Sequence, residues 1–405
     1  MNSPLVDARV VLGVTGSIAC YKAADLASKL TQAGALVDVI LSHGASNFVT
    51  PLTFRSLTHR PVVTDLFDAD SEQAVNHVAM AHDADVVLVA PATAHVIARL
   101  AHGFADDALT TTALASAAPL VVAPAMDGYM FDNPATQENL ETLRRRGATI
   151  IGPESGHLAS GLSGMGRMSE PAHIVDSLKA VLGRRGDMAG RAIVVSAGGT
   201  QEPIDPVRVI TNRSSGKMGY AIAEAARDRG ASVTLVTAPT SLPDPVGVEL
   251  RRVATVAEMR EAVLEACTGA DAVIMAAAVS DYRPAEVASQ KIKKGESGED
   301  GLVLQLVKND DFFLEVPAGV LRVGFAAESE DLVANARGKL ESKGLALIAA
   351  NDITQEDSGF NVDTNRVVII GRDGTEDALP LLTKYQVGHR LLDRVMEALA
   401  AGRVS

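Results

Sequence analysis

Two stretches of the chain join a buried-strand pattern to a glycine-rich turn and the start of a helix. In the second half, the buried-strand run at 191–196 opens into AGGT, and TNRSSGKMG at 211–219 leads into a helix. Glycine permits close backbone approach and positive φ, while serine hydroxyls, a helix start and a lysine suit an anionic group. In the first half, the strand at 10–12 runs into GVTGSIACYK. The sequence therefore predicts two separate phosphate-binding turns.

Neither turn fits the commonest nucleotide signatures. In the second turn Met218 follows Lys217 where a P-loop needs Ser or Thr, and no Gly stands five residues before Gly216. A Rossmann oxidoreductase that uses NAD would need GxGxxG and an acidic residue at the end of the second strand, and GVTGSI and AGGT both lack that pattern. The sequence therefore disfavours both of these classes.

Strand-like and helix-like runs alternate in both halves, with helices such as 17–33 and 133–146. We expect strands at 10–14, 37–41, 86–90, 120–123 and 149–151 in the first half, and at 192–196, 232–236, 272–276, 323–326, 345–349 and 366–370 in the second. Such alternation is typical of doubly wound parallel sheets. Since 405 residues are too many for one core, the predicted fold class is α/β with two doubly wound domains.

The alternating pattern breaks twice. GRRGDMAGR at 183–191 is charged and glycine-rich and has no apolar period, so it predicts a linker at 184–190 between domains at 1–183 and 191–405. Residues 281–308, which include KIKKGESGEDG, interrupt the second sheet. They predict a mobile lysine-bearing loop rather than a core element.

Composition limits the partners. The net charge of −13 argues against non-specific binding to nucleic acid or acidic membranes. Two cysteines, Cys20 and Cys267, cannot build a disulfide framework and give no metal-ligand pair, which favours a reducing compartment. Residues 1–8 lack the features of a secretion signal, and no apolar run reaches the ~18 residues of a membrane span. We therefore expect a cytoplasmic protein that binds small molecules and neither nucleic acid nor membranes.

Further motifs follow the expected strands, where α/β sheets bind ligands. In the first half NHVAMA, APATAHVIARLAHGFADD, PAMDGYM and GMGRM come in an order that resembles the homo-oligomeric flavin-containing cysteine decarboxylases. In the second half DPVRVITNRSSGKMG, AAAVSDYRP, KIKK and VGFAAE resemble phosphopantothenate-cysteine ligase. Across essentially the whole chain, the two sets together resemble the bifunctional decarboxylase-ligase family of coenzyme A biosynthesis.

The resemblance implies a flavodoxin-like first domain that binds FMN and decarboxylates an acylated cysteine. Oxidation of the thiol by the flavin creates a sulfur-carbon double bond that accepts the electrons left by CO2, so the cofactor supplies the difficult chemistry. His77 is the implied base, with an ordinary pKa of about 6.5, although a lone histidine on a helix is usually a surface or cap residue. The implied FMN residues are Gly16, Ser17, Ser42, Thr53, Ala92 and Thr93, of which Thr53 and Ala92 suit packing nearly as well.

This chain departs from that decarboxylase pattern at two positions. Among the implied substrate residues Met126, Asp127 and Met168, the family commonly has Asn where Asp127 stands, and a carboxylate cannot donate as an amide does. Ser160 stands where many members place a cysteine that protonates the enethiol intermediate, and a serine hydroxyl is a far poorer acid. Two interpretations stay open: Ser160 relays a proton, or this half is a slow or non-catalytic flavin-binding regulatory module.

The resemblance implies a Rossmann-like second domain that activates 4'-phosphopantothenate with CTP and joins it to cysteine. Asn212 would hold the acyl-cytidylate intermediate, and Lys291, the first lysine of KIKK, would offset charge on the leaving pyrophosphate, although a solvated loop is the ordinary interpretation of such a run. Mg²⁺ would accompany CTP, with no metal-ligand cluster visible in the sequence. The other implied substrate residues are Ser214, Ser215, Gly216, Lys217, Met275, Ala276, Ala277, Asp281, Asn309, Asp310, Asp311, Phe312, Phe313, Phe325, Lys339 and Lys343.

The resemblance also implies a homo-oligomer in which decarboxylase trimers and ligase dimers combine. Lys339 and Lys343 are four residues apart, so they share one helix face. That spacing suits an exposed face as well as a nucleotide site.

Overall fold

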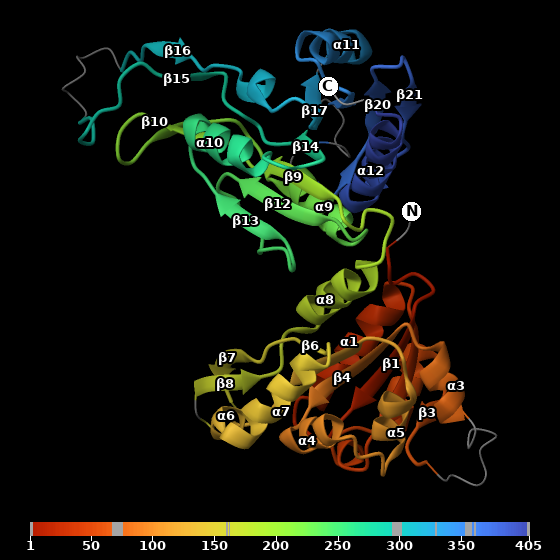
Figure 1. Cartoon of the computed structure of the whole chain (residues 1–405). Helices are drawn as coiled ribbons and strands as arrows, with labels where there is room; N and C mark the ends of the chain where they lie inside the picture. The colour runs from red at the N-terminus through yellow and green to blue at the C-terminus, as the bar shows by residue number, and fades with distance from the viewer. Residues whose placement is uncertain are drawn as a thin grey trace. The chain divides into compact units, whose positions relative to one another are not determined.

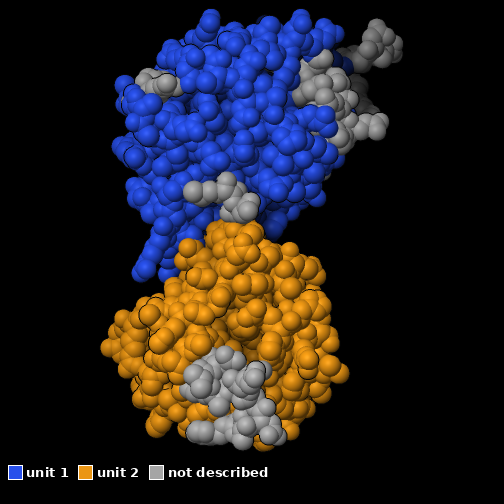
Figure 2. Space-filling model, turned by 90° about the vertical axis from the view of Figure 1, so that its right-hand side faces the viewer, with its two compact units in different colours: residues 1–2, 183–405 blue, residues 3–182 orange. Residues whose placement is uncertain are grey.

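The chain folds into two compact units, residues 3–182 and residues 183–405, which Figure 2 shows in different colours. The computed structural model describes residues 3–66, 76–158, 161, 163–293, 302–328, 330–352, 359 and 362–402. Each unit has its own sheet and its own core, so each is described by itself.

The first unit is built on a six-stranded parallel sheet with the order β3-β2-β1-β4-β5-β6. Its strands are β1 (Arg9–Val14), β2 (Leu36–Leu41), β3 (Val62–Val63), β4 (Val86–Ala92), β5 (Leu120–Pro124) and β6 (Thr149–Ile150). The five strands expected from the sequence are all present, and their own order is 2-1-3-4-5, as in flavodoxin-like sheets. The two-residue edge strand β3 extends this to 3-2-1-4-5-6, the classic Rossmann order.

Helices cover both faces of this sheet because successive side chains of its buried strands point to opposite faces (Figure 1). Val10, Leu12 and Val14 pack with α1 (Cys20–Gln32), α2 (Pro51–Thr58) and α8 (Pro171–Gly183). Val11 packs on the other face with α4 (Ala94–His102), α5 (Ala108–Ala115) and α7 (Pro134–Arg145). The remaining elements are η1 (Ala45–Asn47), α3 (Asn76–Asp83), α6 (Gly128–Asp132) and the antiparallel hairpin of β7 (Glu154–His157) and β8 (Ser163–Arg167).

The second unit has an eight-stranded sheet with the order β13-β12-β9-β14-β17-β18-β20-β21. The first six strands are parallel and follow the Rossmann order, as predicted, while β20 and β21 run antiparallel. The strands are β9 (Ala192–Ala197), β12 (Ser232–Thr237), β13 (Glu249–Arg252), β14 (Ala272–Met275), β17 (Leu321–Glu328), β18 (Leu347–Asp352), β20 (Val367–Gly371) and β21 (Glu376–Ala378). Both domains are therefore doubly wound α/β folds.

Two layers of helices cover this second sheet as well (Figure 1). One face packs against α9 (Lys217–Arg227) and α12 (Lys384–Ala400). The other packs against α10 (Val256–Ala266), η2 (Phe312–Glu315) and α11 (Leu332–Ser342). Helices α9 and α12 begin beside the carboxyl edge of the sheet, where a ligand site is expected.

Short antiparallel ribbons extend from the second sheet. They pair β10 (Gln201–Pro203) with β11 (Val209–Thr211), β15 (Tyr282–Pro284) with β16 (Leu306–Lys308), and β19 (Thr364–Asn365) with β22 (Leu382–Thr383). The segment 281–308 was expected to be a loop without core structure, but its two ends form the β15–β16 ribbon. Residues 294–301, at its centre, lie outside the described part of the chain.

The segment 184–190, predicted to be a linker, packs on the second unit. Met188 is fully buried in its core, and Asp187 accepts hydrogen bonds from the guanidinium of Arg229, with 3.0 Å from Nε to Oδ1. The segment is polar in sequence because only Met188 faces inward. Within the described residues, no helix is long and apolar enough to cross a membrane.

Candidate active sites

The glycine turn of the second unit closes tightly on Asn212. A Cβ built on Gly199 would lie 2.5 Å from the carbonyl oxygen of Asn212. Gly216 has a φ of +75° and caps α9, and a Cβ there would lie 2.6 Å from Cγ2 of Thr240. Because only glycine fits such positions without strain, the turn after β9 and the start of α9 pack backbone to backbone.

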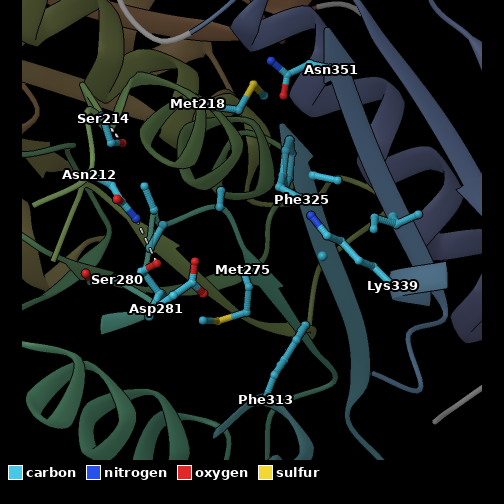
Figure 3. A pocket seen from close by; sticks show the side chains of 18 of the residues that line it. Asn212, Ser214, Met218, Met275, Ser280, Asp281, Phe313, Phe325, Lys339 and Asn351 are labelled. Atoms are coloured by element: carbon cyan, nitrogen blue, oxygen red, sulfur yellow. Dashed lines mark hydrogen bonds between the residues drawn. The ribbon is translucent and has the colours of Figure 1, made fainter. Parts of the chain in front are cut away.

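A cavity of about 790 Å³ opens beside this turn, where β14 and β17 end (Figure 3). Of the residues implied for the ligase, all but Lys291 line it. They are Asn212, Ser214, Ser215, Gly216, Lys217, Met275, Ala276, Ala277, Asp281, Asn309, Asp310, Asp311, Phe312, Phe313, Phe325, Lys339 and Lys343. Residues that lie far apart in the sequence therefore meet around one space, large enough for a small-molecule ligand.

Hydrogen bonds hold the polar wall of this cavity. Nδ2 of Asn212 donates to the carbonyl oxygen of Val279 at 3.1 Å. Asn309 donates from Nδ2 to the carbonyl oxygen of Ser280 at 2.9 Å, and from its N–H to the carbonyl oxygen of Asp281 at 2.8 Å. These bonds give both amide side chains a fixed orientation at the wall.

The facing wall is aromatic and cationic. In Figure 3, Phe325 and Lys339 lie across the cavity from Asn212, with Met275 and Phe313 below them. An aromatic face can stack on any nucleobase, and a lysine ammonium attracts phosphate oxygens. The two walls together suit a nucleotide.

Two ion pairs border the cavity. Nζ of Lys217 lies 2.7 Å from Oδ1 of Asp363, and Nζ of Lys343 lies 2.9 Å from Oδ2 of Asp311. The hydrogen bond from Lys217 lowers the pKa of Asp363. Exposed pairs of this kind contribute little stability, so both ammonium groups can exchange a carboxylate for a more highly charged phosphate. Lys217 is the first residue of α9, so the positive end of a helix dipole lies beside its ammonium group.

In the first unit, the turns after β1 and β2 touch. A Cβ on Gly16 would lie 2.8 Å from the carbonyl carbon of Gly44. The N–H of Ser42 donates to the carbonyl oxygen of the last residue of β1 at 3.0 Å, and Oγ of Ser17 accepts from the N–H of Ala19 at 3.3 Å. Gly16, Ser17 and Ser42 therefore meet at the carboxyl edge of the sheet, as predicted for a phosphate-binding turn.

Thr15 joins this turn to the end of β4. Its Oγ1 donates to the carbonyl oxygen of Pro91 at 2.6 Å and accepts from the N–H of Thr93 at 3.0 Å. Thr93 caps α4 with its side chain, and Ala92 is fully buried. Thr53 lies in α2, whose first turn follows the β2 loop. The structure thus brings Thr93 to the turn and gives Ala92 a packing position; the sequence analysis missed Thr15.

The implied substrate residues of the first unit adjoin the β7–β8 hairpin. The N–H of Met126 donates to the carbonyl oxygen of Gly166 at 3.0 Å. Oδ1 of Asp127 accepts from the N–H of Tyr129 at 3.0 Å and caps α6. Met168 is only 1% exposed and packs in the core, so its side chain has a structural position rather than a place on a substrate wall.

A buried lysine ties this hairpin to α1. Nζ of Lys22 donates to the carbonyl oxygen of Met168 at 2.8 Å and lies 2.9 Å from Oε1 of Glu170, which Arg167 also contacts at 2.7 Å. The hydrogen bond from Lys22 lowers the pKa of Glu170. Since α1 begins three residues after Ser17, this cluster joins the turn at Gly16 and Ser17 to the hairpin.

The two residues implied for proton transfer are only partly located. His77 belongs to α3, but its side chain lies outside the described part of the structure. Ser160 falls between the end of β7 and the start of β8 in the sequence, and it too is outside the described residues. Within the part of the chain that is described, no group of three or more His, Cys, Asp or Glu side chains is arranged to hold a metal ion.

Comparison with known families covers both units. The family model "DNA/pantothenate metabolism flavoprotein C-terminal domain" matches residues 188–399, and the family model "Flavoprotein" matches residues 2–183. The coenzyme A biosynthesis bifunctional protein CoaBC of Vibrio parahaemolyticus is 44% identical over 399 residues, which are 98% of this chain and 99% of that protein. This chain belongs to the CoaBC family.

Membership assigns one activity to each unit. The chain is a bifunctional enzyme of coenzyme A biosynthesis, a decarboxylase in its flavoprotein half and a phosphopantothenate-cysteine ligase in the other. The CoaBC protein of Bacillus subtilis is likewise 44% identical over 392 residues, 95% of this chain and 96% of that one. A solved C-terminal domain of a CoaBC protein is 38% identical and covers 53% of this chain and 98% of that domain, with a TM-score of 0.45.

Lys384 is the most distinctive cavity residue that the sequence analysis missed. It is 4% exposed, and its Nζ donates to the carbonyl oxygens of Gly359, at 2.8 Å, and Val362. Burial, and then the nearby Lys217, lower the pKa of Lys384 to about 8. Nothing in the sequence marks this residue, because its burial depends on α12 packing beside α9.

Proposed function

We propose that the chain converts 4'-phosphopantothenate to 4'-phosphopantetheine in two steps. The second unit forms an acyl-cytidylate from CTP and the pantothenate carboxylate, and the amine of cysteine then displaces CMP. The first unit decarboxylates the resulting amide with FMN. The observation that carries the proposal is the cavity of about 790 Å³ around which the ligase residues converge.

In the ligase half, different residues of the cavity bind the nucleotide and the acyl group. The cationic groups of both walls, Lys339 and Lys343 on one side and the start of α9 opposite them, hold the triphosphate, while Phe325 stacks on the base. The amide of Asn212, fixed by its bond to the carbonyl of Val279, points the acyl oxygen at the α-phosphate. Lys291 approaches the leaving pyrophosphate and offsets its charge.

In the decarboxylase half, the turns at Gly16 and Ser42 form the cofactor's phosphate site. The fit rests on the close contact between Gly16 and Gly44, which brings the backbones of the two turns together and admits no side chain between them. Bound FMN supplies the reversible oxidation of the thiol-bearing substrate. Thr93 fixes the end of β4 against this turn through Thr15.

The proton-transfer residues of this half are proposed from the family pattern. His77 removes a proton from the substrate thiol as oxidation begins, and Ser160 relays the proton that the product needs. Asp127 keeps α6 capped, a task that the family's Asn performs equally well. The interpretation of this half as a regulatory module without activity is not favoured, because the CoaBC relatives are named bifunctional over nearly the whole chain.

We propose Mg²⁺ as the companion of CTP. Mg²⁺ prefers phosphate oxygens, water and one or two carboxylates over a cage of protein ligands. Asp281 and Asp310 line the cavity and carry carboxylates within the wall that faces the triphosphate. They are the candidate protein ligands.

The proposed assembly contains decarboxylase trimers and ligase dimers. Apolar side chains on and beside the β10–β11 and β15–β16 ribbons are 43% to 63% exposed, which marks an interaction surface; they are Val207, Val209, Tyr282, Val287 and Leu306. Ile18, Tyr21, Phe48 and Leu52 form a second exposed set near the cofactor turn. We place the reactions in the cytoplasm, in keeping with the two free, buried thiols.

The test uses the full-length chain. With CTP, 4'-phosphopantothenate and cysteine, we expect pyrophosphate release that stops when any one of the three is left out. The purified protein should be yellow, and adding 4'-phosphopantothenoylcysteine should release CO2. Absence of CTP-dependent pyrophosphate would refute the ligase assignment, and a colourless protein that takes up no added FMN would refute the decarboxylase assignment.

A further inference from the structure

A buried carboxylate lies in the turn between β10 and β11, outside the cavity. Asp205 is 2% exposed, and its Oδ1 accepts from the N–H groups of Val207 at 2.8 Å and of Arg208 at 2.9 Å. Oδ2 accepts from Nε of Arg208 at 2.9 Å and also from its Nη2. The hydrogen bonds from Arg208 hold the pKa of Asp205 well below its usual range. A charged group is buried only when it is satisfied in this way.

The same ion pair binds both backbone groups of one distant residue. Oδ2 of Asp205 accepts from the N–H of Ile292 at 3.2 Å, and Nη2 of Arg208 donates to the carbonyl oxygen of Ile292 at 2.9 Å. The N–H of Ala288 adds a bond of 3.0 Å to the carbonyl oxygen of Ile204. Three hydrogen bonds therefore fix the segment 288–292 on the β10–β11 turn.

Ile292 immediately follows Lys291, the ligase lysine that lies outside the cavity lining. Lys291 is exposed, so its long side chain is not itself held by packing. The clamp on Ile292 fixes the backbone from which that side chain starts. Meanwhile β11 (Val209–Thr211) connects Arg208 to Asn212 at the cavity wall. Lys291 and Asn212 are thus held by one short ribbon.

We propose that Asp205 and Arg208 position Lys291 for the CTP-dependent step by clamping the backbone of Ile292. The proposal rests on the proposed ligase function. Asp205 is a positioning residue in it, because neither Asp205 nor Arg208 is among the described residues that line the cavity. Fixing the start of the lysine side chain limits the positions that its ammonium samples, and such prior placement speeds a step in which charge develops.

Asp205→Asn in the full-length protein tests this. The amide keeps the shape but loses the charge, and its NH2 group opposes the donors that it must accept. We expect the rate of pyrophosphate release at saturating CTP to fall about 10- to 100-fold, since misplacement by about 1 Å has effects of this size. The KM for CTP should change much less, because the cavity itself is intact. Asp271→Asn is the matched control: Asp271 also pairs with an arginine and accepts a backbone N–H, at 2.7 and 2.8 Å, but it lies at the amino-terminal ends of β9 and β14 and makes no contact with Ile292.

Two further measurements separate positioning from general damage. In a Lys291→Ala background, Asp205→Asn should have no additional effect on the residual rate, whereas additive losses would overturn the proposal. Trypsin cleaves after lysine, and the clamp holds the Lys291–Ile292 peptide, so Asp205→Asn should speed cleavage there while the control variant does not. Unchanged cleavage would also overturn it. If Asp205→Asn fails to fold, Arg208→Gln, which leaves Asp205 its backbone donors, is measured in the same way.

A failure of the clamp is distinguishable from a failure of the proposed function. If the wild-type chain releases no pyrophosphate with CTP, the ligase function fails, while the trypsin measurement still tests the contact. If the wild type is active and Asp205→Asn matches it in rate and in cleavage, the clamp is wrong and the ligase function stands.

Discussion

Replacing Gly199 with alanine should disable the ligase half without touching the decarboxylase half. The added Cβ would lie 2.5 Å from the carbonyl oxygen of Asn212, and ordinary contacts begin at 3.4 Å, so the two groups must separate by about 0.9 Å. Because Asn212 is bonded to Val279 at the cavity wall, the strain displaces its amide. A displacement of a substrate-positioning group by about 1 Å lowers the rate of the reaction by about 10²-fold. Overpacking lowers the free energy of unfolding by about 1–3 kcal/mol.

The assay measures pyrophosphate release from CTP and CO2 release from supplied 4'-phosphopantothenoylcysteine in the same preparation. We expect the first to collapse and the second to match wild type, because Gly199 lies in the other compact unit. Gly338→Ala is the control: it neighbours Lys339 in α11, and nothing lies within 4 Å of a Cβ there. Pyrophosphate release by Gly199→Ala within roughly twofold of wild type would refute the argument that the turn positions Asn212.

Other predictions follow from the same structure. Burial lowers the pKa of the His389 imidazole to about 4. Its contribution to the free energy of unfolding is therefore fully present above pH 6.5, and about 3 kcal/mol is lost as the pH drops toward 4. Urea titrations should find this pH dependence absent in His389→Leu. His77→Asn should abolish CO2 release and leave pyrophosphate release intact, and loss of both would indicate global damage. Ser160→Cys should preserve or raise CO2 release if Ser160 only relays a proton, while a large loss in Ser160→Ala would make its hydroxyl the donor. A fragment that starts at residue 184 should be more stable to urea by about 2–5 kcal/mol than one that starts at residue 191, because only the first keeps the buried Met188; equal stability would contradict its core role.

The central strands of both sheets could be predicted because parallel strands buried on both faces form continuous apolar runs. The edge strands β3 and β21 were not predicted, because each is too short to form such a run. β3 has two residues and β21 has three, and the β21 sequence Glu-Asp-Ala carries no apolar signal. Their position depends on a neighbouring strand that supplies hydrogen bonds, and nothing local specifies it. The packing of 184–190 on the second unit could not be predicted either. Met188 is its one buried apolar side chain, and a single apolar residue among charged ones gives no periodic pattern.

The candidate sites divide along the same line. Positions marked by glycine were predictable, because a turn that forbids a Cβ leaves a trace in the sequence at Gly16, Gly199 and Gly216. Thr15 and Lys384 were not predictable, since each gains its role from a partner on another element. The same holds for Asp205, whose bond to Ile292 joins residues far apart in the chain.

The kind of anion that a glycine turn can bind depends on the residues that face the turn. Glycine, serine and a helix start attract any phosphate, so the turns at Gly16 and Gly216 alone predict charge and no more. In the second unit, Phe325 and Lys339 come from β17 and α11 and face that turn across the cavity. An aromatic face beside a lysine favours a ligand that carries a nucleobase and further phosphates as well. The residues that we propose select the nucleotide therefore come from elements late in the chain, and they face the early turn only once the sheet has formed.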